Sequence, residues 1–288
     1  MVISKSPKVS VLTPIYNTKI EYLKEAIESI LSQTFKDFEY LLLNDSPDNT
    51  EIDKCVLAYQ KKDKRIKYFK NERNMGRPFS RNRLIDLSKG EYLDIFDSDD
   101  ISLPTRLKKE VKYLDENPDI GVVSALNQSF GDESIISSLP EFDFDIKVTL
   151  SHHCCICNPC SMIRKSVLID NNIRYNSSYL SSQDYRLWVD LVPFTNFHNI
   201  QEVLLLYRVH SDNTVKRTDR DIYLRRVSTI ISDMRNKYPA HWEEYQRRYI
   251  KKEPKKFRVR LFNIIPLLKV KNNWVYLFEI IPLFKIKF

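Results

Sequence analysis

The chain has 288 residues, of which 42% are hydrophobic and 29% charged, so it can bury a sizeable core and disorder over its whole length is excluded. Its glycines, Gly76, Gly90, Gly121 and Gly131, are too far apart for a GxGxxG or Walker loop, which excludes a phosphate site of that kind. The net charge of +8 belongs to residues 250–288, which hold ten Lys or Arg and two Glu, and the rest of the chain is neutral. The body therefore lacks the basic surface of a nucleic-acid-binding protein, and we expect no nucleic-acid partner.

Apolar runs and helical spacings alternate along the first half of the chain. They predict strands at 8–14, 38–43, 66–69, 92–96 and 121–126, and helices at 20–33, 52–62, 80–88 and 105–116. Further on, the pattern predicts short helices at 165–171 and 183–191, a strand at 202–207 and a helix at 219–238. Strands that alternate with single helices imply right-handed βαβ units. The predicted fold class is therefore α/β, with a mostly parallel sheet flanked by helices.

The composition changes after residue 238, which predicts a body of residues 1–238 and a basic extension of residues 239–288. In the extension, segment 264–271 recurs as 280–287 with six of eight residues identical. Apolar residues at helical spacing predict short amphipathic helices, because the prolines of the repeat argue against one continuous helix. Such an extension suits the surface of an anionic membrane, and docking onto the body or a partner chain is the alternative.

The chain begins without an apolar signal segment and contains no run of 18 apolar residues. We therefore expect a cytoplasmic protein in a reducing compartment, attached peripherally to the inner face of the cell membrane by its extension.

Three carboxylates, Asp97, Asp99 and Asp100, directly follow the expected strand at 92–96. The carboxyl ends of strands are where open α/β sheets bind ligands. Carboxylates this close raise one another's pKa unless a cation neutralises them, and Mg²⁺ or Mn²⁺ accepts such oxygen ligands and could bridge to a diphosphate. The alternative is an acidic turn that caps the next helix. We assign that structural role to Asp100.

Several stretches, in order along residues 8–215, together resemble the family 2 glycosyltransferases, inverting enzymes of the GT-A (Rossmann-like) fold that use nucleotide-sugar donors. The matching stretches are 9–17, 27–35, 44–46, 74–76, 80–82, 90–92, Asp97-Ser-Asp-Asp100, Gln183-Asp-Tyr-Arg-Leu-Trp188 and Tyr207-Arg-Val-His210. The resemblance implies a metal-dependent hexosyltransferase. It would move a sugar from a UDP-sugar to a hydroxyl of a glycan or lipid-linked oligosaccharide, in the synthesis of a bacterial surface polysaccharide such as lipopolysaccharide or capsule.

On the donor side, the resemblance places Pro14, Tyr16 and Asp45 at the nucleotide base. A carboxylate can accept the uracil imide proton, so Asp45 favours a UDP-linked donor, and the alternative for this residue is an Asx turn. Arg81 would reach the base or the diphosphate, unless it is an exposed helical arginine. Ser98 would contact the nucleotide sugar.

For the metal, the resemblance implies that Asp99 is a direct ligand and that Asp97 lies near the ribose or the metal. His210 would contact the metal or the diphosphate, and a solvated loop histidine is the alternative. The implied cofactor is Mn²⁺ or Mg²⁺, whose charge would offset the negative charge that builds on the departing UDP.

Asp184 matches the position of the catalytic base, which takes the proton from the acceptor hydroxyl as its oxygen attacks C1. Its neighbour, usually Glu in the family, is Gln183 here, so a charge beside the base is absent. The alternative for Asp184 is an aspartate favoured by the dipole at a helix N-terminus.

The sequence Cys154-Cys-Ile-Cys-Asn-Pro-Cys160, with two histidines ahead of it, invites a zinc interpretation. It lacks the separated pairs of ligands typical of structural zinc sites, so buried free thiols explain it better. At the level of function, two alternatives remain. One is a non-catalytic sugar-nucleotide-binding or membrane-scaffold protein, and the other is a nucleotidyltransferase that would release pyrophosphate.

Overall fold

The computed structural model describes residues 6–132, 134–210 and 219–250, together with four strands between residues 258 and 285. The chain divides into two compact units, Met1–His241 and Trp242–Phe288. Among the helices of these described ranges, none combines the length and the hydrophobicity that crossing a membrane requires.

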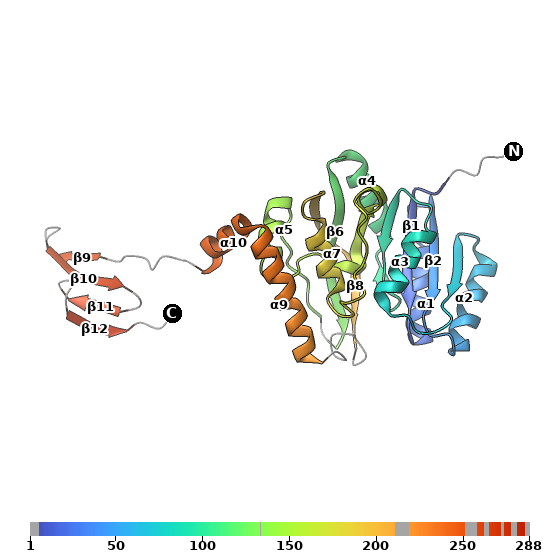
Figure 1. The fold of residues 1–288 in the computed structure, drawn as a ribbon, viewed down its shortest axis with the longest axis horizontal. Coiled ribbons are helices and arrows are strands. Elements are labelled where there is room, and N and C mark those ends of the chain that lie inside the picture. Colours follow the sequence, from blue (N-terminus) through green and yellow to red (C-terminus); the bar gives the residue numbers. More distant parts are fainter. Residues whose placement is uncertain are drawn as a thin grey trace. The chain divides into compact units, whose positions relative to one another are not determined.

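The first unit is built on an eight-stranded sheet with the order β3-β2-β1-β4-β7-β6-β8-β5. Figure 1 shows helices packed along this sheet. The strands are β1 Val9–Ile15, β2 Phe38–Asn44, β3 Ile66–Lys70, β4 Tyr92–Ile95, β5 Ile101–Ser102, β6 Ile120–Gly131, β7 Ser161–Arg164 and β8 Asn196–Val209. The helices of the described residues are α1 Ile20–Leu31, α2 Thr50–Lys62, α3 Arg77–Leu87, α4 Arg106–Glu116, α5 Asp143–Leu150, α6 Lys165–Asp170, α7 Gln183–Leu191, α9 Arg220–Lys237 and α10 Pro239–Tyr245.

This arrangement confirms the predicted fold class. Strands β3, β2, β1 and β4 are parallel neighbours, as expected of βαβ units. The other half of the sheet is mixed, because β7 lies antiparallel between β4 and β6 and β5 pairs antiparallel with β8. Sequence patterns missed β5, β7 and α5, which are too short to show a clear period.

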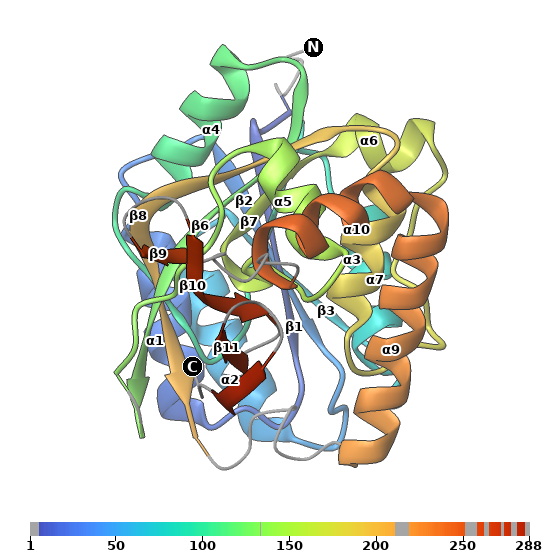
Figure 2. The same cartoon turned by 90° about the vertical axis from the view of Figure 1, so that its left-hand side faces the viewer.

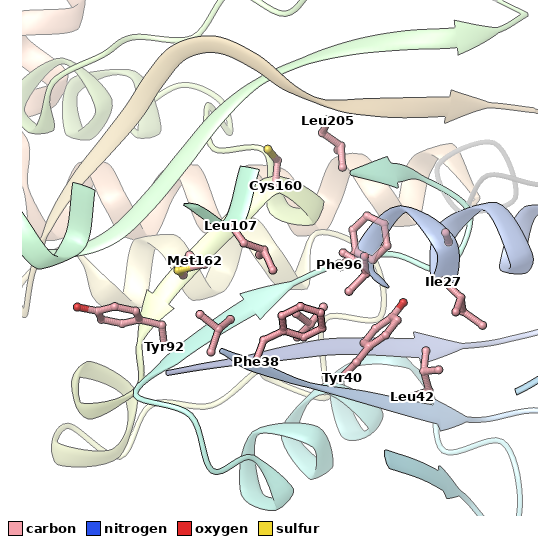
Figure 3. Close-up of a cluster of buried hydrophobic side chains, with 14 of the residues drawn as sticks. Ile27, Phe38, Tyr40, Leu42, Tyr92, Phe96, Leu107, Cys160, Met162 and Leu205 are labelled. Carbon is pink, nitrogen blue, oxygen red and sulfur yellow. The ribbon is translucent and has the colours of Figure 1, made fainter. Parts of the chain in front are cut away.

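The core consists of two hydrophobic clusters, one on each face of the sheet. Strand β2 contributes to both, since Tyr40 and Leu42 belong to the cluster under α1, α2 and α4, whereas Leu41 and Leu43 belong to the cluster under α3, α5, α6, α7 and α9. Figure 3 shows part of the first cluster, and Figure 2 shows the helices around the sheet. A strand buried on both faces explains the unbroken apolar run that predicted it.

An ion pair lies inside the first cluster. Arg106 of α4 donates from both terminal nitrogens to the carboxylate of Asp94 on β4, at 2.7 Å each, and both side chains are fully buried. The Arg106 Nε donates to Ser102 Oγ at 2.7 Å. Burial raises the pKa of the neighbouring Glu110 well above its usual value despite Arg106, which favours the neutral form of Glu110 beside the pair. The pair fixes β4 against α4.

The second unit carries four antiparallel strands, β9 Arg258–Leu261, β10 Ile265–Lys271, β11 Trp274–Leu277 and β12 Ile281–Lys285, in the order β12-β11-β10-β9. The expectation of amphipathic helices is therefore wrong for these four stretches, and Phe257 and Ile264 lie outside the described residues. β-Branched and aromatic residues favour strands, and a proline is tolerated near a strand's start. The two repeat copies supply β10 and β12, which flank β11 and run in the same direction.

We expect Arg106→Ala to lower the free energy of unfolding of the full chain by about 3–5 kcal/mol, because it leaves the Asp94 carboxylate buried without its cation. Urea denaturation followed by circular dichroism measures the change. Lys54→Ala is the control, since Lys54 pairs with Glu51 on the surface and its loss should leave stability unchanged. If Arg106→Ala lowers the free energy of unfolding as little as the control does, the buried ion pair does not stabilise the fold.

Candidate active site

The turns after β1 and β2 meet at the carboxyl edge of the sheet. The Asp45 N–H donates to the carbonyl of Ile15 at 2.8 Å, and the Asn17 N–H donates to Ser46 Oγ at 2.8 Å. Asn17 has a left-handed φ of 49°, which reverses the chain after Tyr16, and Tyr16 is 49% exposed. Strand β1 parts from β4 after Leu12, so Pro14, which has no N–H, lies beyond the part of β1 that is paired on both sides.

Asp45 is 3% exposed and organises the loop that precedes α3. Its Oδ1 accepts from Asn71 Nδ2 at 2.6 Å and from the Met75 N–H at 2.8 Å, and its Oδ2 accepts from the Gly76 N–H at 2.9 Å. Gly76 has a φ of 85°, which side chains disfavour, so a glycine suits this turn. Three of the roughly four acceptor positions of the carboxylate are thus taken, and one on Oδ2 remains. An Asx turn bonds the backbone about two residues further on, whereas the bonds of Asp45 to Asn71, Met75 and Gly76 reach a loop 26 to 31 positions away.

The acidic cluster follows β4, and each of its first three side chains has a different neighbour. Asp97 Oδ1 accepts from Arg81 at 2.7 Å, Ser98 Oγ shares a hydrogen bond of 2.6 Å with Thr18 Oγ1, and Asp99 Oδ2 lies 3.0 Å from His210 Nε2. The side chains of Asp97 and Asp99 are 23% and 26% exposed. The cluster therefore joins residues from α3, the turn after β1 and the end of β8.

Asp100 does not cap a helix, because α4 starts six residues later behind Thr105. It is fully buried and accepts from the backbone N–H of Arg208 at 2.9 Å. Burial, with the charges of Asp99 and Asp97, raises its pKa well above the usual range. The helix-cap interpretation is thus wrong for Asp100, which holds the end of β8 to the acidic cluster.

Arg208 completes that attachment. Its Nε donates to the Asp99 carbonyl at 2.8 Å, and its guanidinium lies between the rings of Tyr22 and Phe130, 4.1 and 4.5 Å from their centroids. The attachment brings His210 beside Asp99 although 111 positions separate them in the sequence. His210 therefore has a carboxylate neighbour, unlike a solvated loop histidine.

The pair of Asp99 and His210 fits a divalent cation in its donor types and its spacing. Burial and the charge of Asp97 raise the pKa of Asp99, and His210 opposes the rise. Neighbouring ligands of an octahedral ion about 2.1 Å from each lie about 3 Å apart. The 3.0 Å between Asp99 Oδ2 and His210 Nε2 matches that spacing. Among the described residues, however, no three His, Cys, Asp or Glu side chains form a group that could hold a metal ion, and Asp97 is bonded to Arg81.

Arg81 is 2% exposed, so the interpretation as an exposed helical arginine is wrong. Its guanidinium lies 5.3 Å from the centre of the Tyr175 ring. Burial works against its charge, but Asp97, Tyr175 and Asp184 together raise the pKa of Arg81. Asp184 itself is half-buried in the first turn of α7, just after Ser182, whose φ of 63° is left-handed. Asp97 thus bonds this arginine, and the charge of Asp184, the expected base, also acts on it.

The cysteines of the 154–160 segment are free thiols, as is Cys55. Cys155, Cys157 and Cys160 are buried, which confirms that expectation for these three, and Cys154 is partly exposed. Burial raises the pKa of Cys155 and Cys160, so both are protonated at neutral pH.

Sequence patterns missed several polar residues of this region, namely Thr18, Asn71, Asn158 and Tyr175. Asn71 directly follows β3, and the carboxyl end of that strand was a usable signal. Asn158 lies within the cysteine segment, where the cysteines were the residues considered as ligands. Nothing local in the sequence marks Tyr175, which reaches the site only through the tertiary fold.

Comparison with known proteins decides the family. Residues 10–171, more than half of the chain, match the family model described as Glycosyl transferase family 2. The chain belongs to glycosyl transferase family 2. The glycosyltransferase MJ1057 of Methanocaldococcus jannaschii, named as uncharacterized, is 36% identical over 228 residues, which are 77% of this chain and 74% of that protein. The O-antigen biosynthesis glycosyltransferase WbnJ of Escherichia coli is 30% identical over 201 residues, 68% of this chain and 78% of that one.

Solved structures share the fold of this glycosyltransferase. The S. aureus protein TarS (residues 1–349), solved with UDP-GlcNAc, superposes with a TM-score of 0.66 at 20% identity over 79% of this chain and 66% of that chain. The mannosyltransferase PcManGT of Pyrobaculum calidifontis, solved with GDP-Man and Mn²⁺, gives a TM-score of 0.64 at 15% identity over 84% and 70%. Both likenesses establish the GT-A architecture of the transferase.

Proposed function

We propose that this glycosyltransferase moves a sugar from a UDP-sugar, with inversion at C1, to a hydroxyl of a glycan or lipid-linked acceptor in surface-polysaccharide synthesis. The observation that carries the proposal is the placement of Asp45, Asp97 and Asp99 just after strands β2 and β4, with the buried Arg81 bonded to Asp97. The charge of Asp184 on α7 also acts on this arginine and raises its pKa. The name of WbnJ, an O-antigen biosynthesis enzyme, supports the class of acceptor.

The free acceptor position of Asp45 supports uracil as the base. The carboxylate already takes three hydrogen bonds, so one more donor is what it can receive. Uracil offers a single imide N–H at that edge, whereas guanine offers an N–H and an amino group side by side, which need both carboxylate oxygens. TarS was solved with a UDP-sugar and PcManGT with GDP-Man, so relatives of this fold use both nucleotides. Pro14 and Tyr16 would lie against the same base.

For the chemical step, Asp184 takes the proton of the acceptor hydroxyl as its oxygen forms a bond to C1 and the bond from C1 to the diphosphate breaks. The proton moves to Asp184, and the electron pair of the broken bond leaves with UDP. Asp184 is partly exposed, so an acceptor can reach it from solvent.

Asp99 and His210 would hold Mn²⁺ or Mg²⁺, with Asp97 and Ser98 toward the donor. Bound there, the ion would neutralise charge on the leaving diphosphate. The PcManGT structure contains Mn²⁺, which supports this choice of ion. The residues of this chain supply one carboxylate and one imidazole at ligand spacing.

A non-catalytic sugar-nucleotide-binding protein is the alternative, but such a protein would need no base at Asp184. Turnover separates the possibilities. Release of UDP from a panel of UDP-sugars supports the transferase, release of pyrophosphate a nucleotidyltransferase, and donor binding without turnover a binding protein.

We expect Asp184→Asn to lower transfer by at least about a hundredfold while donor affinity changes little, because the amide cannot accept the proton. UDP release and calorimetric donor titration measure both quantities. Asp190→Asn is the matched control on the same helix, where Asp190 pairs with Arg186. Near-normal turnover of Asp184→Asn would remove Asp184 from the mechanism.

We expect Asp99→Ala and His210→Ala each to abolish the gain in UDP affinity that Mn²⁺ confers, because each removes one ligand. Calorimetric titration of UDP with and without Mn²⁺ is the measurement. Asp86→Ala, at a surface aspartate of α3 that pairs with Arg174, should keep the full metal effect. If the Mn²⁺ effect survives in both site variants, the ion binds elsewhere.

We propose further that residues 250–288 attach the enzyme to an anionic membrane, which would keep it at the inner face of the cell membrane. The support is the net charge of +8 in this segment. Each basic residue near such a surface contributes about 1 kcal/mol, an attraction that salt weakens. The full chain should therefore sediment with phosphatidylserine vesicles at low salt and leave them at high salt. Neutral phosphatidylcholine vesicles are the control, and equal binding to both would refute the charge-based attachment.

A further inference from the structure

Both terminal nitrogens of Arg81 have partners within the protein, whereas its buried Nε has no hydrogen-bond partner among the described residues. One terminal nitrogen bonds Asp97 at 2.7 Å. With the Asn158 amide turned so that its oxygen faces the guanidinium, that oxygen accepts from Nη2 at 2.9 Å and Nη1 at 3.3 Å. The face of the guanidinium covers the Tyr175 ring, and the side chain is 2% exposed. Of this bonded pair, Asp97 is partly exposed to solvent and Arg81 is not, so a nucleotide that enters from solvent would reach Asp97 first.

Tyr175 connects Arg81 to the segment of the chain that precedes Asp184. Tyr175 is 2% exposed, and its hydroxyl lies 3.4 Å from the Asn158 amide. The side chain of Asn82, the neighbour of Arg81 on α3, donates to the Tyr175 carbonyl at 2.8 Å and accepts from its N–H at 2.9 Å. Tyr175 begins the segment 175–183, which runs directly into α7 and Asp184. The far end of this segment is held by Arg226, which donates to Ser181 Oγ at 3.0 Å.

We propose that Arg81 is a positioning residue that does not touch the donor. It ties the donor-side carboxylate Asp97 to the segment 175–183 and thereby sets where Asp184 stands relative to the acidic cluster. This inference rests on the proposed function, and it replaces the expected contact of Arg81 with the base or the diphosphate.

The geometry of arginine suits this task. Its planar group makes in-plane hydrogen bonds to Asp97 and Asn158 while its face rests on an aromatic ring. A lysine in its place would keep the charge but would not hold all three partners at once. The link therefore depends on the shape of the side chain as well as on its charge.

The test compares Arg81→Lys, Tyr175→Leu and the double variant in the full-length protein, with Mn²⁺ present. Calorimetry gives the dissociation constant of UDP, and UDP release from the donor gives kcat. We expect each single variant to lower kcat about tenfold or more with less than about a threefold change in UDP affinity. We expect the double variant to be no slower than the worse single variant, because both changes break one link.

Tyr175→Phe keeps the ring beneath the guanidinium and should recover most of the kcat lost in Tyr175→Leu. Arg65→Lys is the matched control, because Arg65 also pairs with an aspartate, Asp63 at 2.7 Å, and lies over a ring, Phe38 at 4.3 Å, away from the site. Its kcat should equal that of the wild type.

Two results would overturn the inference. If Arg81→Lys weakens UDP binding by the same factor as it lowers kcat, the arginine binds the donor directly. If the two single effects multiply in the double variant, or if Tyr175→Leu leaves kcat unchanged, the link does not position the base. Should Arg81→Lys fail to fold, Tyr175→Leu and Tyr175→Phe decide the question by themselves. A wild-type protein that binds no UDP would instead refute the proposed function, and this inference with it, before any variant is compared.

Discussion

The position of the acidic cluster depends on one buried interaction, the ion pair between Arg106 and Asp94. An ionised carboxylate without exposure to water is tolerated only when a cation is bonded to it. Strand β4 therefore cannot slide past α4 without separating Asp94 from Arg106. Asp97 follows three residues later. The position of β4 against α4, and with it the place where the chain leaves the sheet, is therefore set by this pair, whose arginine also lies over the Phe96 ring.

The carboxylates around this point are crowded, and the fold neutralises each of them in its own way. Asp94 and Asp97 each bond an arginine, and Asp99 faces an imidazole. Asp100 has a pKa raised by burial and accepts a backbone N–H. Under the proposed function, Asp99 and its histidine neighbour would bind the divalent ion together. The other three carboxylates bond residues of α4, α3 and β8 and so fix these elements around the acidic cluster.

A second set of contacts links the residues that we propose on the donor and acceptor sides of the reaction. Asp45 shapes the loop before α3 and keeps one acceptor position open, and α3 then presents Arg81 to Asp97 and Asn82 to Tyr175. Helix α3 and the Gly76 that precedes it thus contact Asp45, the acidic cluster and the segment that leads to Asp184. We therefore expect a change in α3 to affect both sides of the proposed reaction.

The sequence by itself determined the α/β class, the parallel half of the sheet, the family resemblance and the candidate residues Asp45, Asp97, Asp99 and Asp184, because these follow from local periodicity and from motifs read in order. Only the tertiary structure decided that Arg81 is buried, that Asp100 bonds β8 and that His210 stands beside Asp99. Contacts between residues as many as 111 positions apart depend on how strands pair, and short elements such as β5 and β7 carry too little periodicity to reveal that pairing. In the extension, strand pairing also overrode a helical spacing, because hydrogen bonds between β9, β10, β11 and β12 are formed by the folded unit and not by any one segment.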